Sequence, residues 1–102
     1  MRVIIFFDLP TGTPSERKAY MQFRKYLLNA GYDMLQYSVY VRIAGSRDDA
    51  QHMLGIVKRH LPCKGQVRAL MVTEKQYAAM QILLGKPTIA EKETGCQEML
   101  VL

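Results

Sequence analysis

The sequence lacks any long apolar run. Its 102 residues contain no stretch close to the ~20 apolar residues that a membrane-spanning helix needs. The N-terminus has no signal-peptide layout either, because the apolar residues begin directly after Arg2. These absences predict a cytoplasmic protein with no membrane partner.

Metal-binding patterns of cysteine and histidine are also missing. Cys63 and Cys96 are the only cysteines, and neither belongs to a CxxC or another zinc-ligand spacing. His52 and His60 are too far apart for an HxxxH site. Cysteines in a cytosolic chain are expected to be free thiols rather than a disulfide. Structural zinc and a disulfide framework are therefore not expected.

What the chain does have is an apolar run, Val3–Phe7, that leads directly into Asp8. Such a run, bounded by the turn at residues 10–12, predicts a strand buried on both faces at the centre of a sheet. Asp8 lies where this strand leaves the sheet. A carboxylate there must be ionised in water, paired or bound to a cation, because burying it alone is costly. Asp8 either starts the turn or has a function, and its position leaves both interpretations open.

Capping signals predict two helices. Thr13-Pro14-Ser15-Glu16 forms a capping box at the start of a helix over about residues 14–30, which Gly31 ends. Ser46 begins the second helix and Pro62 ends it. Strand-forming composition predicts strands at about 32–36, 37–44 and 66–72, a short helical turn at 73–80 and a further small strand at 81–85.

Tyrosines at three strand positions are candidates for base stacking, namely Tyr32, Tyr37 and Tyr40. Tyrosines at such positions are more often simply packed, with the hydroxyl in water. The sequence does not decide between these roles.

The first predicted helix has an apolar side and a basic side. Arg17, Lys18, Arg24 and Lys25 lie together on the basic side, with Met21 and Leu28 among them. A solvated charged face would explain the four cations without a ligand. The two apolar residues favour a face that touches a partner. The net charge of +5 is compatible with a polyanion.

The last part of the chain differs from the rest. Residues 1–85 form the predicted domain, and 86–102 form a polar linker that ends in an apolar tail, Met99, Leu100, Val101 and Leu102. Such a tail is expected to fold back on its own sheet or to add a strand to a neighbour's sheet.

The predicted order is that of an α+β, ferredoxin-like βαββαβ fold with an antiparallel sheet and extra C-terminal strands. Both helices are then on one face of the sheet, and a second copy of the chain is the economical cover for the other face. The fold does not choose a function. RNA-recognition modules share it, but their aromatic strand motif is absent. A small-molecule regulatory domain stays open, although no Gly-rich loop follows the first strand.

Several short segments, in their order and spacing, carry a family resemblance over nearly the whole chain. They are Phe7–Thr11, Glu16–Tyr20, Phe23–Lys25, Gln36–Tyr40 and Val72–Gln76. With these segments the sequence resembles the CRISPR-associated protein 2 family, in its type II form. The resemblance implies a ferredoxin-like homodimer whose C-terminal strands pack on or join the partner's sheet. It also implies a heterohexamer with the CRISPR integrase subunit, CRISPR-associated protein 1, and a bound protospacer DNA duplex.

The resemblance further implies a Mg²⁺-dependent endonuclease acting on RNA, including single-stranded RNA, or on DNA, with Asp8 as the metal and catalytic residue. One carboxylate cannot build a Mg²⁺ site by itself, but two copies of Asp8 facing each other across a twofold axis would supply the second. We therefore expect either this enzyme or a scaffold that binds duplex backbone through Arg17, Lys18, Arg24 and Lys25. A toxin-type endoribonuclease dimer outside CRISPR is the alternative.

Overall fold

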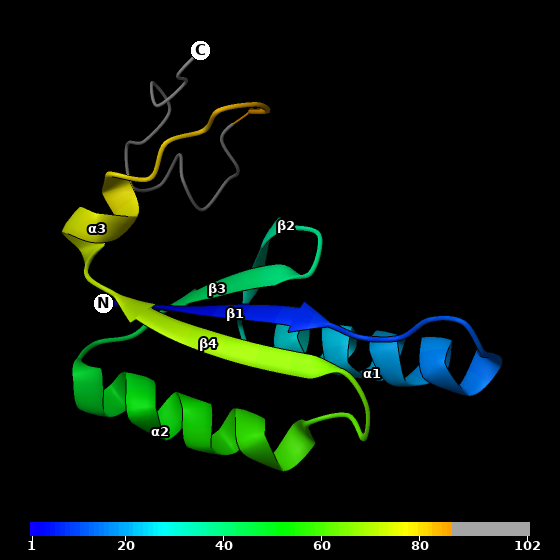
Figure 1. Ribbon diagram of the computed structural model, residues 1–102. Helices are drawn as coiled ribbons and strands as arrows, with labels where there is room; N and C mark the ends of the chain where they lie inside the picture. The colour runs from blue at the N-terminus through cyan, green and yellow to red at the C-terminus, as the bar shows by residue number, and fades with distance from the viewer. Residues whose placement is uncertain (87–102) are drawn as a thin grey trace.

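The protein is described here by a computed structural model that defines residues 1–86 (Figure 1). The elements are, in order, β1 (Arg2–Asp8), α1 (Pro14–Asn29), β2 (Asp33–Gln36), β3 (Val39–Ile43), α2 (Arg47–Val57), a 3₁₀ turn (Lys58–His60), β4 (Gln66–Val72) and α3 (Glu74–Ala78). None of the helices within residues 1–86 is long and apolar enough to cross a membrane.

The four strands form one antiparallel sheet in the order β2-β3-β1-β4. β1 pairs with both β3 and β4, so the first strand is central, as its unbroken apolar run predicts. Figure 1 shows α1 and α2 on one face of the sheet and α3 on the other. The predicted ferredoxin-like α+β fold is confirmed.

The predicted helix starts are also present. At the first turn of α1, Thr13 Oγ1 accepts from the Glu16 N–H at 3.2 Å, and Glu16 Oε1 accepts from the Thr13 N–H at 3.0 Å. At α2, Ser46 Oγ accepts from the Asp49 N–H at 3.1 Å. Each bond satisfies a backbone N–H that the helix itself leaves without a partner, which fixes where the helix begins.

The main core lies between the sheet and the two long helices. Val3, Ile5 and Phe7 of β1 are buried there, against Phe23 and other apolar residues of α1 and α2. The Phe7 ring meets Phe23 edge-on at a centroid distance of 5.2 Å. Tyr40 also enters this core and stacks on Phe7 at 5.6 Å. In β3 the apolar Val39, Val41 and Ile43 alternate with Tyr40 and Arg42, and the side that carries Tyr40 is the core side.

The opposite side of the sheet, which we call the open face, carries the other residues of β1. Cross-strand pairing places Ile4 beside Val41 and Leu70, and Phe6 beside Val39 and Arg68. α3 covers one end of this face, where Tyr77 packs on Ile4 and Val41. Toward the other end Phe6 is partly exposed and Asp8 is exposed. The sheet therefore offers an apolar surface that α3 covers only in part.

The segment after α3 differs from the prediction. Residues 81–85 do not form a strand, and only Ile82 makes an isolated bridge. Leu83 and Leu84 are 67% and 96% exposed, so this apolar run has no core to pack against within the described residues. The predicted tail contacts of Met99, Leu100, Val101 and Leu102 lie outside the described residues, as does nearly all of the predicted linker.

Candidate functional site

Asp8 is the last residue of β1, and its side chain lies on the open face of the sheet. Its neighbour in sequence, Phe7, points into the helix-side core, so alternation along the strand turns Asp8 the other way. The side chain is exposed. An exposed carboxylate at a strand end is free to meet a cation or a second chain.

A shallow depression of about 300 Å³ surrounds Asp8. It is lined by the end of β1, the turn between β2 and β3, and the start of β4: Phe6, Phe7, Asp8, Tyr37, Ser38, Val39, Gln66 and Arg68. The turn is fixed to β1 because the Phe7 N–H donates to the Ser38 carbonyl oxygen at 3.0 Å. Ser38 has a φ of 64°, a conformation that residues other than glycine adopt only rarely. The turn is therefore held in one unusual shape directly beside Asp8.

Gly65 allows the loop before β4 to pass close to the end of β1, where Asp8 lies. It precedes β4 and has a φ of 96°. A Cβ added to Gly65 would lie only 2.6 Å from the Asp8 carbonyl oxygen, far inside normal contact distance. Glycine is required here because the loop before β4 passes directly over the end of β1. A glycine directly before a strand is a local signal in the sequence, but its approach to Asp8 depends on the fold.

The described residues of one chain do not form a complete metal site. No group of three or more His, Cys, Asp or Glu residues comes together within residues 1–86. Mg²⁺ is commonly held by one or two carboxylates, with water and substrate phosphates completing its shell. Asp8 can supply one such carboxylate from an open position. No second carboxylate of the described residues lines the depression.

The basic residues predicted to bind nucleic acid do not line the depression around Asp8. All four lie on α1, which Figure 1 shows on the same face of the sheet as α2 and opposite α3: Arg17, Lys18, Arg24 and Lys25. Arg17 Nη1 donates to the Thr11 carbonyl oxygen at 3.2 Å. None of the four basic residues forms an ion pair with another described residue. The structure thus separates the predicted catalytic and binding residues onto two faces.

Met21 and Leu28, the two apolar residues among the basic residues of α1, are exposed, as the helical pattern predicts. Met21 is 55% and Leu28 is 39% exposed. Together with Lys18, Arg24 and Lys25 they line a shallow surface along α1. We call this surface the basic face of α1.

Arg68 and Gln66 join the site without any local sequence signal. Arg68 lies beside Phe6 and Gln66 beside Asp8 across the β1–β4 pairing. Arg68 Nη2 donates to Gln66 Oε1 at 3.4 Å, and this is the only hydrogen bond that the Arg68 side chain makes with another described residue. Placing them beside Asp8 requires the register of two strands that are far apart in the sequence.

The fold and site define a class: small ferredoxin-like proteins with an exposed carboxylate at the end of the central strand. The family profile "CRISPR associated protein Cas2" matches residues 1–80. The chain belongs to this family, and the predicted resemblance is confirmed.

Similar proteins support the same assignment. The chain is 46% identical over 99 residues to "CRISPR-associated endoribonuclease Cas2" of Acidovorax ebreus, covering 97% of both chains. It is 45% identical over 102 residues to the protein of the same name from Ligilactobacillus salivarius, covering both completely. Among solved structures, Streptococcus pyogenes Cas2 aligns with a TM-score of 0.61 at 18% identity, over 81% of this chain and 99% of that one. That last similarity concerns the fold alone.

Proposed function

We propose that this chain acts in CRISPR spacer acquisition as a homodimer that binds protospacer DNA and bridges dimers of the integrase subunit. Membership of the Cas2 family supports the CRISPR setting. The basic face of α1 supports a nucleic-acid partner, since its cations have no ion-pair partner within residues 1–86. The family match argues against the alternative function, a toxin-type endoribonuclease outside CRISPR.

We propose in addition that the dimer is a Mg²⁺-dependent endonuclease acting on RNA or DNA. The observation that carries this proposal is the exposed Asp8 carboxylate in the depression on the open face. Relatives at about 45% identity bear the name endoribonuclease. Asp8 from each of two subunits would hold the ion. When bound, the ion would polarise the phosphodiester and activate water for attack.

Substitution of Asp8 tests the nuclease. We expect Asp8→Ala to abolish Mg²⁺-dependent cleavage of labelled RNA and DNA while the protein stays folded by circular dichroism. Asp33→Ala is the matched control, because Asp33 is an exposed carboxylate outside the depression. Undiminished cleavage by the Asp8→Ala protein would refute the assignment of Asp8.

The same variant separates enzyme from scaffold in cells. If spacer acquisition survives Asp8→Ala while cleavage is lost, the role in acquisition is that of a scaffold. Loss of acquisition with an intact dimer would instead show that Asp8 chemistry is needed.

Salt dependence tests the basic face of α1. We expect duplex affinity to fall steeply with salt, because each phosphate contact releases counterions, with a slope of about 0.9 per contact in a log–log plot. Replacing Lys18 and Lys25 by Gln should reduce that slope by about 2. The matched control replaces Lys58 and Lys64, which are exposed cations outside α1. A flat salt dependence of the unmodified protein would exclude this face as the DNA contact.

A further inference from the structure

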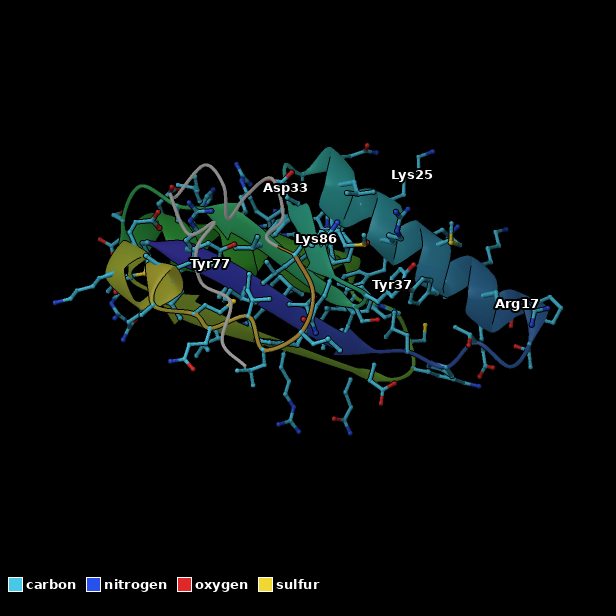
Figure 2. The ribbon with its side chains drawn as sticks, turned by 90° about the horizontal axis from the view of Figure 1, so that it is seen from above. Arg17, Lys25, Asp33, Tyr37, Tyr77 and Lys86 are labelled. Carbon is cyan, nitrogen blue, oxygen red and sulfur yellow. The ribbon has the colours of Figure 1, made fainter. Side chains whose placement is uncertain are left out.

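The structure divides the candidate stacking tyrosines into two groups. Tyr32 and Tyr40 are 2% and 1% exposed, so their rings belong to the core. Tyr37 is 86% exposed, although it lies between two strands of the sheet. Figure 2 looks down on the open face, with α3 over one end and Tyr37 toward the other, near the end of β1. Only Tyr37 of these three can offer a ring face to a ligand.

Tyr37 is held at the site by its neighbours in the turn. Ser38 is bound to β1 through the Phe7 N–H, and Gln36 pairs with Val39 across the hairpin. The backbone on both sides of Tyr37 is therefore fixed, while its side chain is in solvent. A fixed backbone reduces the entropy lost when the ring orders against a ligand.

The depression beside Tyr37 combines three chemical features. Phe6 and Val39 give it an apolar wall, Asp8 supplies a carboxylate, and Arg68 supplies a guanidinium with no ion-pair partner among the described residues. Aromatic rings stack on nucleobases, and arginine forms forked hydrogen bonds with phosphate. One depression thus contains groups suited to bind a nucleobase, a phosphate and a cation.

We propose that Tyr37 and Arg68 bind one unpaired nucleotide beside Asp8, with Tyr37 stacking on the base and Arg68 pairing with a phosphate. The proposal rests on the proposed nuclease function for its biological meaning, and it specifies which residues hold the strand. The nucleotide is unpaired because a base within a duplex already stacks on its neighbours and offers no free face to Tyr37. RNA and DNA share this chemistry, so the test includes both.

The test measures binding of short single-stranded oligonucleotides that carry one 2-aminopurine. RNA and DNA oligonucleotides are measured in separate arms, both in Ca²⁺ buffer. Stacking on Tyr37 should quench the probe in at least one arm. Tyr37→Ala should abolish the quenching and weaken binding roughly 5- to 150-fold, the range for loss of one stacked base. Tyr37→Phe keeps the ring and should bind as the unmodified protein does.

Arg68→Gln tests the phosphate contact in the same assay. It should weaken binding and reduce the salt slope by about 0.7, the value for one contact to a single strand. Arg59→Gln is the matched control, since Arg59 is an exposed arginine of the 3₁₀ turn and does not line the depression. A salt slope that Arg68→Gln leaves unchanged would overturn the role of Arg68.

Two results would overturn the role of Tyr37. One is unchanged affinity and quenching in both arms with Tyr37→Ala. The other is a loss of binding fully explained by loss of the dimer in analytical ultracentrifugation, which would make Tyr37 a contact between copies. Neither result depends on cleavage. If Asp8→Ala still cleaves but Tyr37→Ala no longer quenches, the nuclease assignment fails and the nucleotide site stands.

Discussion

Burial separates residues that look alike in the sequence. Tyr32 is almost completely buried, and no described residue forms a hydrogen bond with its hydroxyl. Tyr37 is almost completely exposed. Burial raises the pKa of Tyr32 above its usual value near 10, and the Arg42 guanidinium, which lies 5.9 Å from the ring centre, offsets part of this effect. The pKa of Tyr26 is raised in the same way.

The raised pKa of Tyr32 predicts a loss of stability at alkaline pH. Below pH ~10 the hydroxyl is protonated in both the folded and the unfolded chain. As the pH rises further, the unfolded chain releases this proton first, so the free energy of unfolding falls until the pH passes the folded pKa. Tyr32→Phe should flatten this fall and should change stability at neutral pH by less than about 1 kcal/mol, because it removes an unpaired hydroxyl.

Urea unfolding at neutral pH and above pH ~10 measures the effect. Tyr37→Phe is the control, since its ring is already in water, and its profile should follow that of the unmodified protein. An equally steep alkaline loss in the Tyr32→Phe protein would show that other groups cause it.

At the scale of single residues, Asp8 was accessible to sequence reasoning and Arg68 was not. An unbroken apolar run that stops at an acid is a local pattern, and it placed Asp8 correctly at the end of the central strand. Arg68 reaches the site through the pairing of β4 with β1, which no local pattern encodes. The four basic residues were placed correctly on one helix, and three of them line its basic face, but their separation from Asp8 depends on which side of the sheet α1 covers.

At the scale of elements, β1 and α3 are joined by a contact that the sequence did not reveal. Arg2 is 3% exposed, at the start of the central strand. Its Nε donates to both carboxylate oxygens of Glu74 at 3.1 Å, and its guanidinium lies 4.4 Å from the centre of the Tyr77 ring. The N-terminal amino group lies 3.4 Å from Glu74 as well. α3 is thereby attached to the open face by charge as well as by apolar contact.

Removal of Glu74 should release α3 from the sheet. Glu74→Ala leaves the buried Arg2 guanidinium without its carboxylate, so we expect a loss of about 1–3 kcal/mol in urea unfolding. The lower part of that range reflects the half-exposed side chain of Glu74. Relative to the unmodified protein, the Glu74→Ala protein should show a larger increase in amide hydrogen exchange in α3 than in the core strands.

Two comparisons isolate the ion pair. Lys75→Ala changes the next residue of α3, which is exposed, and should leave stability nearly unchanged. A double-mutant cycle with Arg2→Met separates the pair from the loss of an acidic residue at the start of the helix. Additive effects in that cycle would mean that the pair does not hold α3.

The elements themselves were largely predictable, because helix starts and turns are encoded by neighbouring residues. The capping box at Thr13, the helix start at Ser46 and the two strands on either side of residue 37 were predicted and are present. The strand expected at residues 81–85 was wrong because an apolar run becomes a strand only where a partner strand is available.

At the scale of the whole molecule, the sheet separates two surfaces. The basic face of α1 lies on the helix side, whereas Asp8, Tyr37 and the exposed apolar residues of β1 and β4, Phe6 and Leu70, lie on or beside the open face. A homodimer formed through the open faces would bring the two Asp8 residues toward one axis and leave both copies of α1 on the outside. The proposed metal site and the proposed duplex contact are then compatible in one particle.

This arrangement predicts that Leu70 is a dimer contact. Leu70 is 52% exposed and lies beside Ile4 in the middle of the open face. Burying a leucine contributes about 1.5–3 kcal/mol, and a lysine in its place would have to lose its hydration. Leu70→Lys should therefore weaken the dimer by roughly 10-fold or more in sedimentation velocity. Leu61→Lys is the matched control, since Leu61 is 46% exposed and follows the 3₁₀ turn beside α1, away from the open face. If Leu61→Lys weakens the dimer and Leu70→Lys does not, the copies meet through their helices, and two Asp8 residues cannot share one ion.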